Sequence, residues 1–374
     1  MKILMAAGGT GGHIYPALAL TTYLKQNHPT ARIIWVTGKR NLEQRILSKT
    51  DIYFKRINAC PLPRKLSWRW IEFGWKMVIS FFQSFLIFLQ FRPDVVVGMG
   101  SFHSCPVVIT AFFFRIPRLI CEQNVFPSLS NRLLSKFASK IAISFSQTKY
   151  LLPCSTWKKI YFTGNPIRNS IVDAVKEESL RKLGLKKDKF TLLFFGGSQG
   201  AHHLNQVAVE TVKLLKKDGT GEKLQFIFIT GENDWEFVSR PILKMEIPAK
   251  IFTFLPQIHY AYAAADLVIS RSGATTLAEI TARGIPAILI PYPSATDKHQ
   301  LKNAQILEKR GAARIINEDE LTPQRLGKVI EELIRNKRLI LKMGGKSREL
   351  GKKDATWKVA KIVYSLALPK DCDK

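Results

Sequence analysis

Short runs of almost unbroken apolar residues recur along the chain and alternate with segments in which apolar residues repeat every three to four positions. The first half contains KILMAAG, ARIIWVTG, DVVVGMG, RLICEQN and KIAISF, and the second half TLLFFGG, LQFIFITG, KIFTFL, DLVISRSG and PAILIP. Unbroken Val, Ile, Leu and Phe are typical of strands buried on both faces of a parallel sheet. The repeated strand–helix–strand order therefore predicts an α/β chain with two doubly wound, Rossmann-like parallel sheets.

The boundary between the two predicted domains falls near FTGNPIR, residues 162–168, where a Gly-Asn-Pro turn interrupts the pattern. We expect an N-terminal domain over residues 1–164 and a C-terminal domain over residues 165–344. The last amphipathic segment, around DATWKVAKIVYSL, is expected to form a helix within residues 345–368 that returns to the N-terminal domain. A chain of 374 residues is long enough for two domains that each bury a core.

Three of the predicted strands end in glycine-rich sequences, which are GGTGGH at 8–13, GMGSF at 98–102 and GGSQGA at 196–201. In open parallel sheets ligands bind beyond the carboxyl ends of the strands, where glycine backbone and a helix N-terminus receive negative charge. None of the three fits G-x-G-x-x-G, because Ile14 takes the place of the third glycine in GTGGHI, and none fits the P-loop. Although a single glycine-rich turn is often only a tight turn, three of them predict an anion or sugar held in a cleft between the domains.

His13 is the first candidate for chemistry, because it opens a predicted helix beside four glycines. A neutral imidazole there can take a proton from a hydroxyl, and the helix N-terminus favours the neutral form. Helix capping or packing is the alternative role. Arg168 in GNPIR and Ser198 in GGSQGA are candidates for stabilising a diphosphate leaving group, with a surface ion pair as the alternative for Arg168.

Glu279, at the end of RSGATTLAE, lies early in a helix that follows a buried strand. Its carboxylate can accept two hydrogen bonds from neighbouring ribose hydroxyls, whereas a solvated helix glutamate is the alternative. Gln300 and Asn303 in DKHQLKN are three residues apart, so they share a helix face and suit sugar hydroxyls, although surface amides are common. We expect no metal and no other cofactor, because the one D-x-D sequence lies in the terminal tail at 371–373 and His202–His203 has no clustered carboxylate.

The chain is strongly basic, with 57 Lys and Arg against 29 Asp and Glu and a formal net charge of +28. Such a field attracts nucleic acid, anionic lipid headgroups or phosphorylated substrates, and general solubility is the plain alternative. The five cysteines contain no C-x-x-C pair, which predicts free thiols in a reducing compartment. With no signal-peptide pattern at the start, we expect the cytoplasm.

Residues 77–91, MVISFFQSFLIFLQF, form the longest uncharged apolar segment. A membrane span needs about 20 apolar residues, and Lys76 and Glu72 stand directly upstream, so we expect a buried or interfacial helix. The preceding stretch mixes Arg64, Lys65 and Arg69 with tryptophans, which suits a lipid headgroup boundary as well as an ordinary helix with a basic edge.

Taken together, these motifs resemble the MurG family of peptidoglycan N-acetylglucosaminyltransferases, which have the GT-B architecture of two Rossmann-like domains facing a cleft. The resemblance rests on GGTGGH, GMGSF, EQN at 122–124, GNPIR, GGSQGA, RSGATTLAE and DKHQLKN in the family's order over nearly the full length. It implies an inverting transfer of GlcNAc from UDP-GlcNAc to the 4-hydroxyl of the MurNAc-pentapeptide of lipid I, which is carried on undecaprenyl diphosphate. The product is lipid II, made for peptidoglycan at the cytoplasmic face of the cell membrane by a peripheral enzyme that binds an anionic surface and no nucleic acid.

By this resemblance His13 is the base, and the remaining family residues bind UDP-GlcNAc. The implied contacts are Thr10, Gly11, Gly12 and Asn124 at the sugar, Arg168 and Ser198 at the diphosphate, Leu255 at uracil, Ala274, Thr275, Thr276, Leu277, Ala278 and Glu279 along the nucleotide with Glu279 at the ribose, and Gln300 and Asn303 at GlcNAc hydroxyls. The chain departs from the family in two places, where Ser101-Phe102 stands for the usual Gly-Tyr and Cys121 for a frequent histidine. The first departure removes a phenolic hydroxyl from the loop, which puts an acid–base role at that position in doubt.

Three other functions fit parts of the pattern. Another GT-B glycosyltransferase with a lipid acceptor, such as diacylglycerol, would share the donor motifs, and only an acceptor assay separates the two. A UDP-GlcNAc epimerase on the same fold would act without any lipid acceptor. A nucleic-acid-binding protein is suggested by charge alone and would need a basic stripe with exposed stacking aromatics, whereas the tryptophans here cluster at one apolar segment.

Overall fold

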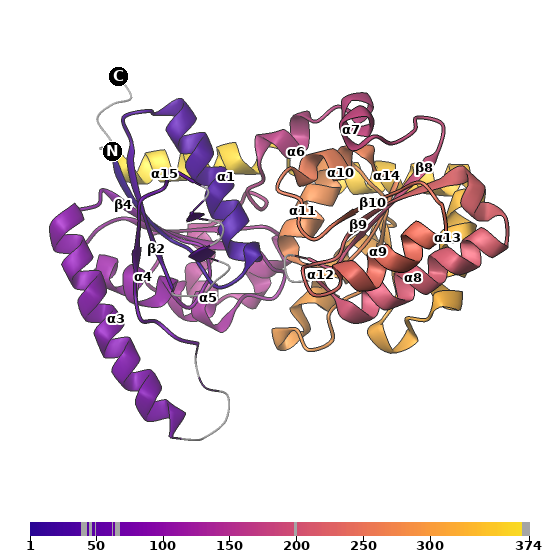
Figure 1. Ribbon diagram of the computed structural model, residues 1–374. Coiled ribbons are helices and arrows are strands. Elements are labelled where there is room, and N and C mark those ends of the chain that lie inside the picture. The colour runs from indigo at the N-terminus through magenta and orange to yellow at the C-terminus, as the bar shows by residue number, and fades with distance from the viewer. Residues whose placement is uncertain are drawn as a thin grey trace. The chain divides into compact units, whose positions relative to one another are not determined.

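The computed structural model of the chain describes residues 1–38, 43–44, 47–48, 50–61, 63, 68–197 and 200–368. It divides the chain into two compact units (Figure 1). Unit 1 comprises Met1–Arg168 and Asp354–Lys374, and unit 2 comprises Asn169–Lys353. The hydrophobic pattern placed the first boundary four residues earlier, at 164–165, and the returning helix at 345–368. Arg64, Lys65 and the 371–373 tail lie outside the described residues.

Unit 1 is built on a seven-stranded, wholly parallel sheet in the order β3-β2-β1-β4-β5-β6-β7. The strands are β1 Lys2–Ala6, β2 Arg32–Thr37, β3 Phe54–Arg56, β4 Val95–Gly98, β5 Arg118–Glu122, β6 Lys140–Ile143 and β7 Ile160–Phe162. The described α-helices are α1 Gly11–Asn27, α3 Arg69–Phe91, α4 Ser104–Phe113, α5 Leu129–Leu134 and α15 Ala355–Ala367, joined by the 3₁₀ helices η1 Ser146–Leu151 and η2 Cys154–Lys159.

The two faces of this sheet carry separate cores. Ile3 and Met5 pack against α1 and α15, whereas Leu4 and Ala6 pack on the opposite face with α3, α4 and α5 (Figure 1). Both alternate residues of β1 are therefore buried, which is why the strand reads as an unbroken apolar run. The C-terminal helix belongs to this unit, and the hydroxyl of Thr356 both accepts from the Ile167 N–H at 3.0 Å and donates to the Ile167 carbonyl at 2.7 Å.

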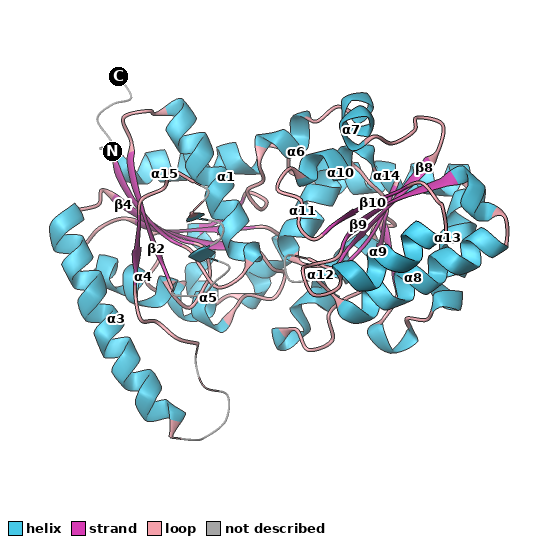
Figure 2. Ribbon diagram, viewed as in Figure 1, coloured by secondary structure: helices cyan, strands magenta, loops and turns pink. Residues whose placement is uncertain are grey.

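Unit 2 is built on a six-stranded parallel sheet in the order β10-β9-β8-β11-β12-β13, with helices on both faces (Figure 2). The strands are β8 Phe190–Phe195, β9 Leu224–Ile229, β10 Ala249–Phe252, β11 Leu267–Ser270, β12 Ala287–Leu289 and β13 Ala313–Ile315. The α-helices are α6 Asn169–Asp173, α7 Lys176–Leu183, α8 His202–Lys217, α9 Trp235–Lys244, α10 Ile258–Ala264, α11 Ala274–Arg283, α12 His299–Lys309, α13 Pro323–Arg335 and α14 Lys337–Leu350, with the 3₁₀ helices η3 Thr220–Lys223, η4 Thr296–Lys298 and η5 Glu318–Glu320. The fold class predicted from the sequence, two doubly wound parallel-sheet domains, is confirmed.

Each sheet has one point where the strand order reverses, between β1 and β4 in unit 1 and between β8 and β11 in unit 2. The paired strands end level with each other, since Ala6 pairs with Gly98 and Phe195 with Ser270. Loops that leave such a pair diverge to opposite sides, which opens space for a ligand beyond the carboxyl ends. The three glycine-rich sequences and RSGATT all lie at these two points.

Candidate functional site

The first glycine loop connects β1 to α1 and holds a carboxylate of its own chain. Gly9 has φ +92°, a left-handed conformation that favours glycine, and its N–H donates to the carboxylate of Glu43. A Cβ added to Gly8 would lie 2.7 Å from Glu43 Oε1 and 2.9 Å from His103 Nδ1. Glu43 and His103 are both buried, and Glu43 also accepts a hydrogen bond from the Thr37 hydroxyl at 2.9 Å. The loop is bare backbone because polar side chains pack directly beneath it.

Helix α1 begins immediately after this loop and carries His13 in its first turn. The carbonyl of Thr10, the N-cap residue, accepts the N–H of His13 at 3.0 Å, whereas the Thr10 side chain makes no capping bond. The half-buried imidazole of His13 lies with Nδ1 3.2 Å from Oε1 of Gln123, in the loop that follows β5. Gly11 and Gly12 are the first two residues of the helix. The base candidate is thus held by backbone on one side and by a buried amide on the other.

Asn124, the predicted sugar contact, is positioned by the buried carboxyl of Glu122. Glu122 accepts from the backbone N–H of Asn124 at 2.9 Å and from its Nδ2 at 3.3 Å, from the Ser128 N–H at 3.0 Å and from Asn131 Nδ2 at 2.8 Å. Burial raises the pKa of Glu122, and these four donors act in the opposite direction. The carboxyl group therefore organises the EQN turn.

The two departures from the family pattern lie close to this turn. Burial raises the pKa of the Cys121 thiol to about 12, so it remains a neutral S–H group near neutral pH. Phe102 packs its ring against His103, with a 4.0 Å separation between the ring centroids, and its edge would lie 3.9 Å from a Cβ on Gly9. At position 102 the chain therefore has an apolar ring that lines the first glycine loop.

Arg168, the last residue of the first segment of unit 1, reaches the same helix as His13. Its guanidinium carbon lies 5.1 Å from the centre of the Tyr15 ring, within cation–π range. The preceding turn requires glycine at position 164, where φ is +83°. The GNPIR motif thus brings a cation to the first turns of α1.

In unit 2, the GGSQGA loop leads from β8 into α8. Gly197 and Gly200 have φ of +97° and +78°, and a Cβ on Gly200 would come within 2.4 Å of the Thr230 carbonyl oxygen. Ser198, the predicted diphosphate contact in this loop, lies outside the described residues. The loop crosses the end of β9 so closely that only glycine fits at position 200.

Helix α11 follows the second strand of the reversal point, β11. Its N-cap residue is Gly273, which has no side chain to cap the first backbone N–H groups. Thr275 and Glu279 are buried, at 9% and 5% exposure, while Thr276 and Ala278 are half-buried. Glu279 is therefore not the solvated helix glutamate that was one alternative. Ala274 and Leu277 are buried, and Leu255 is half-buried in the loop after β10.

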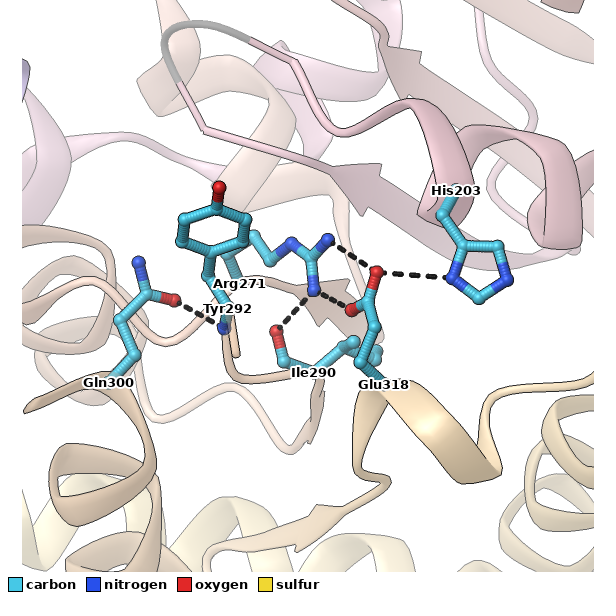
Figure 3. A network of polar contacts seen from close by, with 6 residues as sticks. All are labelled: His203, Arg271, Ile290, Tyr292, Gln300 and Glu318. Atoms are coloured by element: carbon cyan, nitrogen blue, oxygen red, sulfur yellow. Dashed lines mark hydrogen bonds and ion pairs between the residues drawn. The ribbon is translucent and has the colours of Figure 1, made fainter. Parts of the chain in front are cut away.

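An ion pair joins buried Arg271, three residues before the start of α11, to half-buried Glu318 (Figure 3). Arg271 bonds both carboxylate oxygens of Glu318, at 2.9 Å for Nη2–Oε1, and also donates to the Ile290 carbonyl at 3.3 Å. His203 Nδ1 lies 3.1 Å from Glu318 Oε1, and the Arg271 guanidinium lies 5.6 Å from the Tyr292 ring centre. Burial opposes the charge on Glu318, but Arg271, aided by His203, outweighs it and lowers the pKa of Glu318.

Gln300 and Asn303 bind the neighbouring loops from helix α12. Gln300 Oε1 accepts the Tyr292 N–H at 3.0 Å, so its amide nitrogen is the group that it can offer a ligand (Figure 3). Asn303 is fully buried and donates through Nδ2 to the Ser272 carbonyl at 3.3 Å, while the Ser272 hydroxyl donates to the Gln300 carbonyl at 2.8 Å. In this arrangement Asn303 fixes the loop after β11 and does not present its amide at the surface.

The structure brings the predicted residues together in two groups, each within one unit. Thr10 to His13, Asn124 and Arg168 gather around the start of α1, and Ala274 to Glu279, Gln300 and Asn303 gather around the start of α11. Sequence reasoning missed the roles of Gln123, Glu43 and the Arg271–Glu318 pair. Gln123 was visible within the EQN motif, but its partner His13 is 110 residues away. Within the described ranges, no group of three His, Cys, Asp or Glu side chains is placed to hold a metal ion.

Two family models match the chain. The glycosyltransferase family 28 N-terminal domain matches residues 3–143, and the glycosyltransferase family 28 C-terminal domain matches residues 191–359. Each match begins in the first strand of one of the two sheets.

Relatives named UDP-N-acetylglucosamine–N-acetylmuramyl-(pentapeptide) pyrophosphoryl-undecaprenol N-acetylglucosamine transferase are similar over nearly the whole chain. The protein of Halothermothrix orenii is 42% identical over 358 residues, covering 94% of this chain and 95% of its own length. That of Thermoanaerobacter sp. is 38% identical over 371 residues, covering 98% of this chain and 100% of its own length.

Solved structures show the same architecture. Acinetobacter baumannii MurG is similar with a TM-score of 0.75 and 26% identity, over 97% of this chain and 99% of that chain. The S. aureus MnaA–UDP co-structure is similar with a TM-score of 0.70 and 16% identity, over 99% of this chain and 98% of that chain. At 16% identity, the similarity to MnaA shows a shared fold and nothing further.

The Arg271–Glu318 pair yields a prediction for stability. Glu318→Gln keeps the size of the side chain but leaves the Arg271 guanidinium, whose side chain is 10% exposed, without a countercharge. We expect the free energy of unfolding at pH 7 to fall by about 2–3 kcal/mol, below the range for fully buried pairs because Glu318 is a fifth exposed. Chemical denaturation followed by circular dichroism measures it, with Glu236→Gln, in the exposed pair with Arg240, as the control.

The same pair predicts a pH dependence. Because the folded-state pKa of Glu318 is lowered, its contribution to stability is present above its unfolded value of about 4.3 and is lost as pH falls through the folded value. As pH falls from 6 to below about 4.3, the free energy of unfolding of Glu318→Gln should therefore decrease less than that of the parent. Equal stability of Glu318→Gln and Glu236→Gln at pH 7 would contradict the role of the pair.

Proposed function

Because the chain belongs to glycosyltransferase family 28, we propose that it transfers N-acetylglucosamine from UDP-N-acetylglucosamine to the 4-hydroxyl of the N-acetylmuramoyl-pentapeptide of lipid I, and so makes lipid II for peptidoglycan. The names of the relatives state this donor and this acceptor, and the likeness extends over 94–98% of the chain. The observation that carries the proposal is the position of the motifs, because the donor loops and the histidine lie at the order-reversal points of the two sheets.

Unit 2 holds the donor in this proposal. The uncapped start of α11 and the glycine loop before α8 receive the diphosphate through backbone N–H groups, as helix N-termini do for phosphates elsewhere. Glu279 accepts the ribose hydroxyls, the backbone of Leu255 reads uracil and Gln300 donates to a sugar hydroxyl. Asn303 contributes by fixing the loop after β11. Ser198 and Arg168 contribute to diphosphate binding, and Asn124 contacts the sugar, as the family resemblance implies.

His13 acts as the base. The 4-hydroxyl gives its proton to the imidazole while its oxygen forms a bond to C1 of GlcNAc. The bond between C1 and the diphosphate oxygen breaks, and its electron pair leaves with UDP, so attack from the opposite face inverts C1. The transition state is oxocarbenium-like by analogy with glycoside cleavage, and preorganised N–H groups stabilise the leaving diphosphate.

Helix α3 supplies the reason to place the reaction at a membrane surface. Its exposed side carries Ile71, Trp75, Val78, Phe82 and Leu89, which are spaced three, four or seven residues apart and therefore lie in one stripe. Its buried side includes Ser80 and Ser84, whose hydroxyls bond the carbonyls one turn back. The buried side also includes Ile87, Phe88 and Phe91, so α3 is apolar on both faces, and its exposed apolar stripe is the feature that an ordinary surface helix lacks.

Two adjoining cavities extend this apolar surface. One of about 590 Å³ is lined by Phe81, Phe82, Phe85, Thr110, Phe113 and Phe114, and one of about 480 Å³ by Phe112, Phe113, Arg115 and Arg118. Aromatic rings beside arginines match the boundary between acyl chains and anionic headgroups. Among the described helices α3 is long and apolar enough to cross a membrane, with 22% of its most apolar window buried. Because one side packs on the core of unit 1, we propose that α3 lies along an anionic bilayer on the cytoplasmic side.

The first test of function is product analysis. Purified enzyme with UDP-GlcNAc and a lipid I analogue should form the β-linked disaccharide product, with no transfer to diacylglycerol and no sugar isomerisation when the acceptor is left out. Transfer to diacylglycerol would support a different lipid glycosyltransferase, and isomerisation alone would support an epimerase.

The same assay tests the base. We expect His13→Ala to lower kcat by about 10²–10⁴-fold while UDP affinity, measured by calorimetry, stays within about twofold, because the base takes part only in proton transfer. His28→Ala, at the opposite end of the same helix, is the matched control and should keep the parent rate. Transfer at the parent rate by His13→Ala would exclude this role.

The membrane surface predicts salt-dependent binding to vesicles that contain anionic lipid. Burying an aromatic side chain contributes about 1.5–3 kcal/mol, so Trp75→Ser with Phe82→Ser should weaken binding at least tenfold in a sedimentation assay. Leu243→Ser with Leu341→Ser removes two equally exposed side chains from unit 2 and is the control. Vesicle binding that changes neither with salt concentration nor with the α3 substitutions would contradict the proposal that α3 contacts the membrane.

A further inference from the structure

The groups around Gln123 determine which partner donates the hydrogen bond between His13 and Gln123. His13 Nδ1 lies 3.2 Å from Gln123 Oε1, and Gln123 is 2% exposed. An amide oxygen only accepts hydrogen bonds and an amide nitrogen only donates them, so the orientation of the amide decides which atom of the imidazole carries hydrogen.

The orientation of the Gln123 amide is fixed by a backbone carbonyl. Its Nε2 lies 3.3 Å from the carbonyl oxygen of Cys121, which also accepts from Asn131 Nδ2 at 3.0 Å. Rotating the amide by half a turn would place two oxygen acceptors against each other in a buried position. The nitrogen therefore faces Cys121, and the oxygen faces His13.

The glycine at position 100 is explained by the same network. Gly100, in the loop after β4, has φ +83°, and a Cβ there would lie 2.9 Å from Asn131 Nδ2, 3.1 Å from the Cys121 carbonyl oxygen and 3.1 Å from Gln123 Oε1. A side chain at this position would crowd the Gln123 amide oxygen, the Cys121 carbonyl that orients the amide, and the Asn131 amide that shares this carbonyl. The second glycine of the GMG sequence thus makes room for this network.

From this geometry we infer that Gln123 is a positioning residue for His13, which it holds in the tautomer protonated on Nδ1, so that Nε2 accepts the proton of the acceptor hydroxyl. The inference deepens the proposed function, because it rests on His13 being the base. In the neutral imidazole an acceptor at Nδ1 requires the hydrogen to be there, which leaves the basic lone pair on Nε2. The other tautomer would place two lone pairs against each other and would have no base at Nε2.

The step balances without any further reagent. The O–H bond of the acceptor breaks, its proton moves to Nε2, the oxygen bonds to C1 of the sugar and the diphosphate leaves with the electron pair of the C1–O bond. Nδ1–H remains bonded to Gln123 throughout. A neutral amide orients the ring as the carboxylate of a catalytic triad does, but it adds no charge beside the imidazolium that forms.

The experiment combines kinetics with nitrogen NMR of histidine. Gln123→Met removes the acceptor and keeps the length of the side chain. We expect kcat to fall about 10- to 100-fold, by analogy with the loss seen when the orienting partner of a metal-bound histidine is removed, with UDP affinity within about twofold of the parent. In ¹⁵N-histidine spectra without substrate, assigned by comparison with His13→Ala, the parent should carry the His13 proton on Nδ1, and Gln123→Met should populate the Nε2–H tautomer.

Gln123→Glu separates positioning from simple loss of structure. A carboxylate also accepts from Nδ1–H, so this variant should keep the tautomer and recover part of the parent kcat at high pH. Its second oxygen faces the Cys121 carbonyl oxygen in place of Nε2, so its thermal stability should be lower than that of the parent. Because the carboxylate stabilises the imidazolium, the acidic limb of the kcat profile should move to higher pH. A role limited to folding would move stability in both variants and would not move this limb.

Gln225→Met is the matched control, because Gln225 is equally buried in unit 2, where it bonds Lys186 and Thr191. We expect it to lower thermal stability and leave kcat unchanged. The inference is overturned if parent His13 carries its proton on Nε2, or if folded Gln123→Met keeps kcat within about twofold. The NMR result needs no turnover, so a parent that fails to glycosylate lipid I refutes the proposed function separately from the tautomer.

Discussion

The site depends on one steric constraint, which is that backbone and buried polar atoms must come closer together than any side chain allows. At Gly8, Gly100 and Gly200, an added Cβ would lie within 3 Å of a carboxylate, an amide or a carbonyl oxygen. All three positions follow strands at the points where the sheet order reverses. The reversal opens the space, and the missing side chains let polar groups fill it in fixed geometry. Chemistry at these loops therefore requires both the parallel topology and the glycines.

Buried and half-buried carboxylates then hold the candidate functional segments in place. Glu43 binds the first glycine loop, Glu122 gathers the turn that carries Asn124, and Glu318 holds Arg271 at the start of the donor segment. In a chain with 28 excess positive charges, Glu43 and Glu122 are buried and the side chain of Glu318 is 20% exposed, and each of the three accepts two or more hydrogen bonds or ion pairs. Most Lys and Arg side chains are exposed or half-buried, which in the proposed function provides positive charge for an anionic bilayer and a diphosphate-linked acceptor.

Much of the fold could be read from the sequence because strands buried on both faces have an unmistakable composition. The short edge strands β3, β7 and β13 were missed, since FKR, IYF and ARI are three-residue segments of which only Ala313 is buried. Within the candidate site, the motif residues could be proposed from the sequence because glycine, histidine and arginine stand out locally. The partners of His13 and Arg271 were not, because they lie 110 and 47 residues away and only the sheet brings them together. Asn303 was named from its position on a helix face, but that position does not tell whether its amide is buried, as it is in the structure.

The family departures in this chain sharpen the argument for a histidine oriented by an amide. With phenylalanine at position 102 no phenol is available in the loop after β4, and the neutral thiol of Cys121 has too high a pKa to exchange protons near pH 7. The buried carboxyl of Glu122 faces Asn124, Ser128 and Asn131, and it is occupied by their four hydrogen bonds. Among the groups around this turn, the imidazole of His13 is therefore the best suited to accept a proton, because Gln123 orients it. The backbone carbonyl of Cys121 sets that orientation through two successive hydrogen bonds, one that it accepts from the Gln123 amide and one that this amide accepts from His13. Because a main-chain atom does this, the residue type at position 121 can vary.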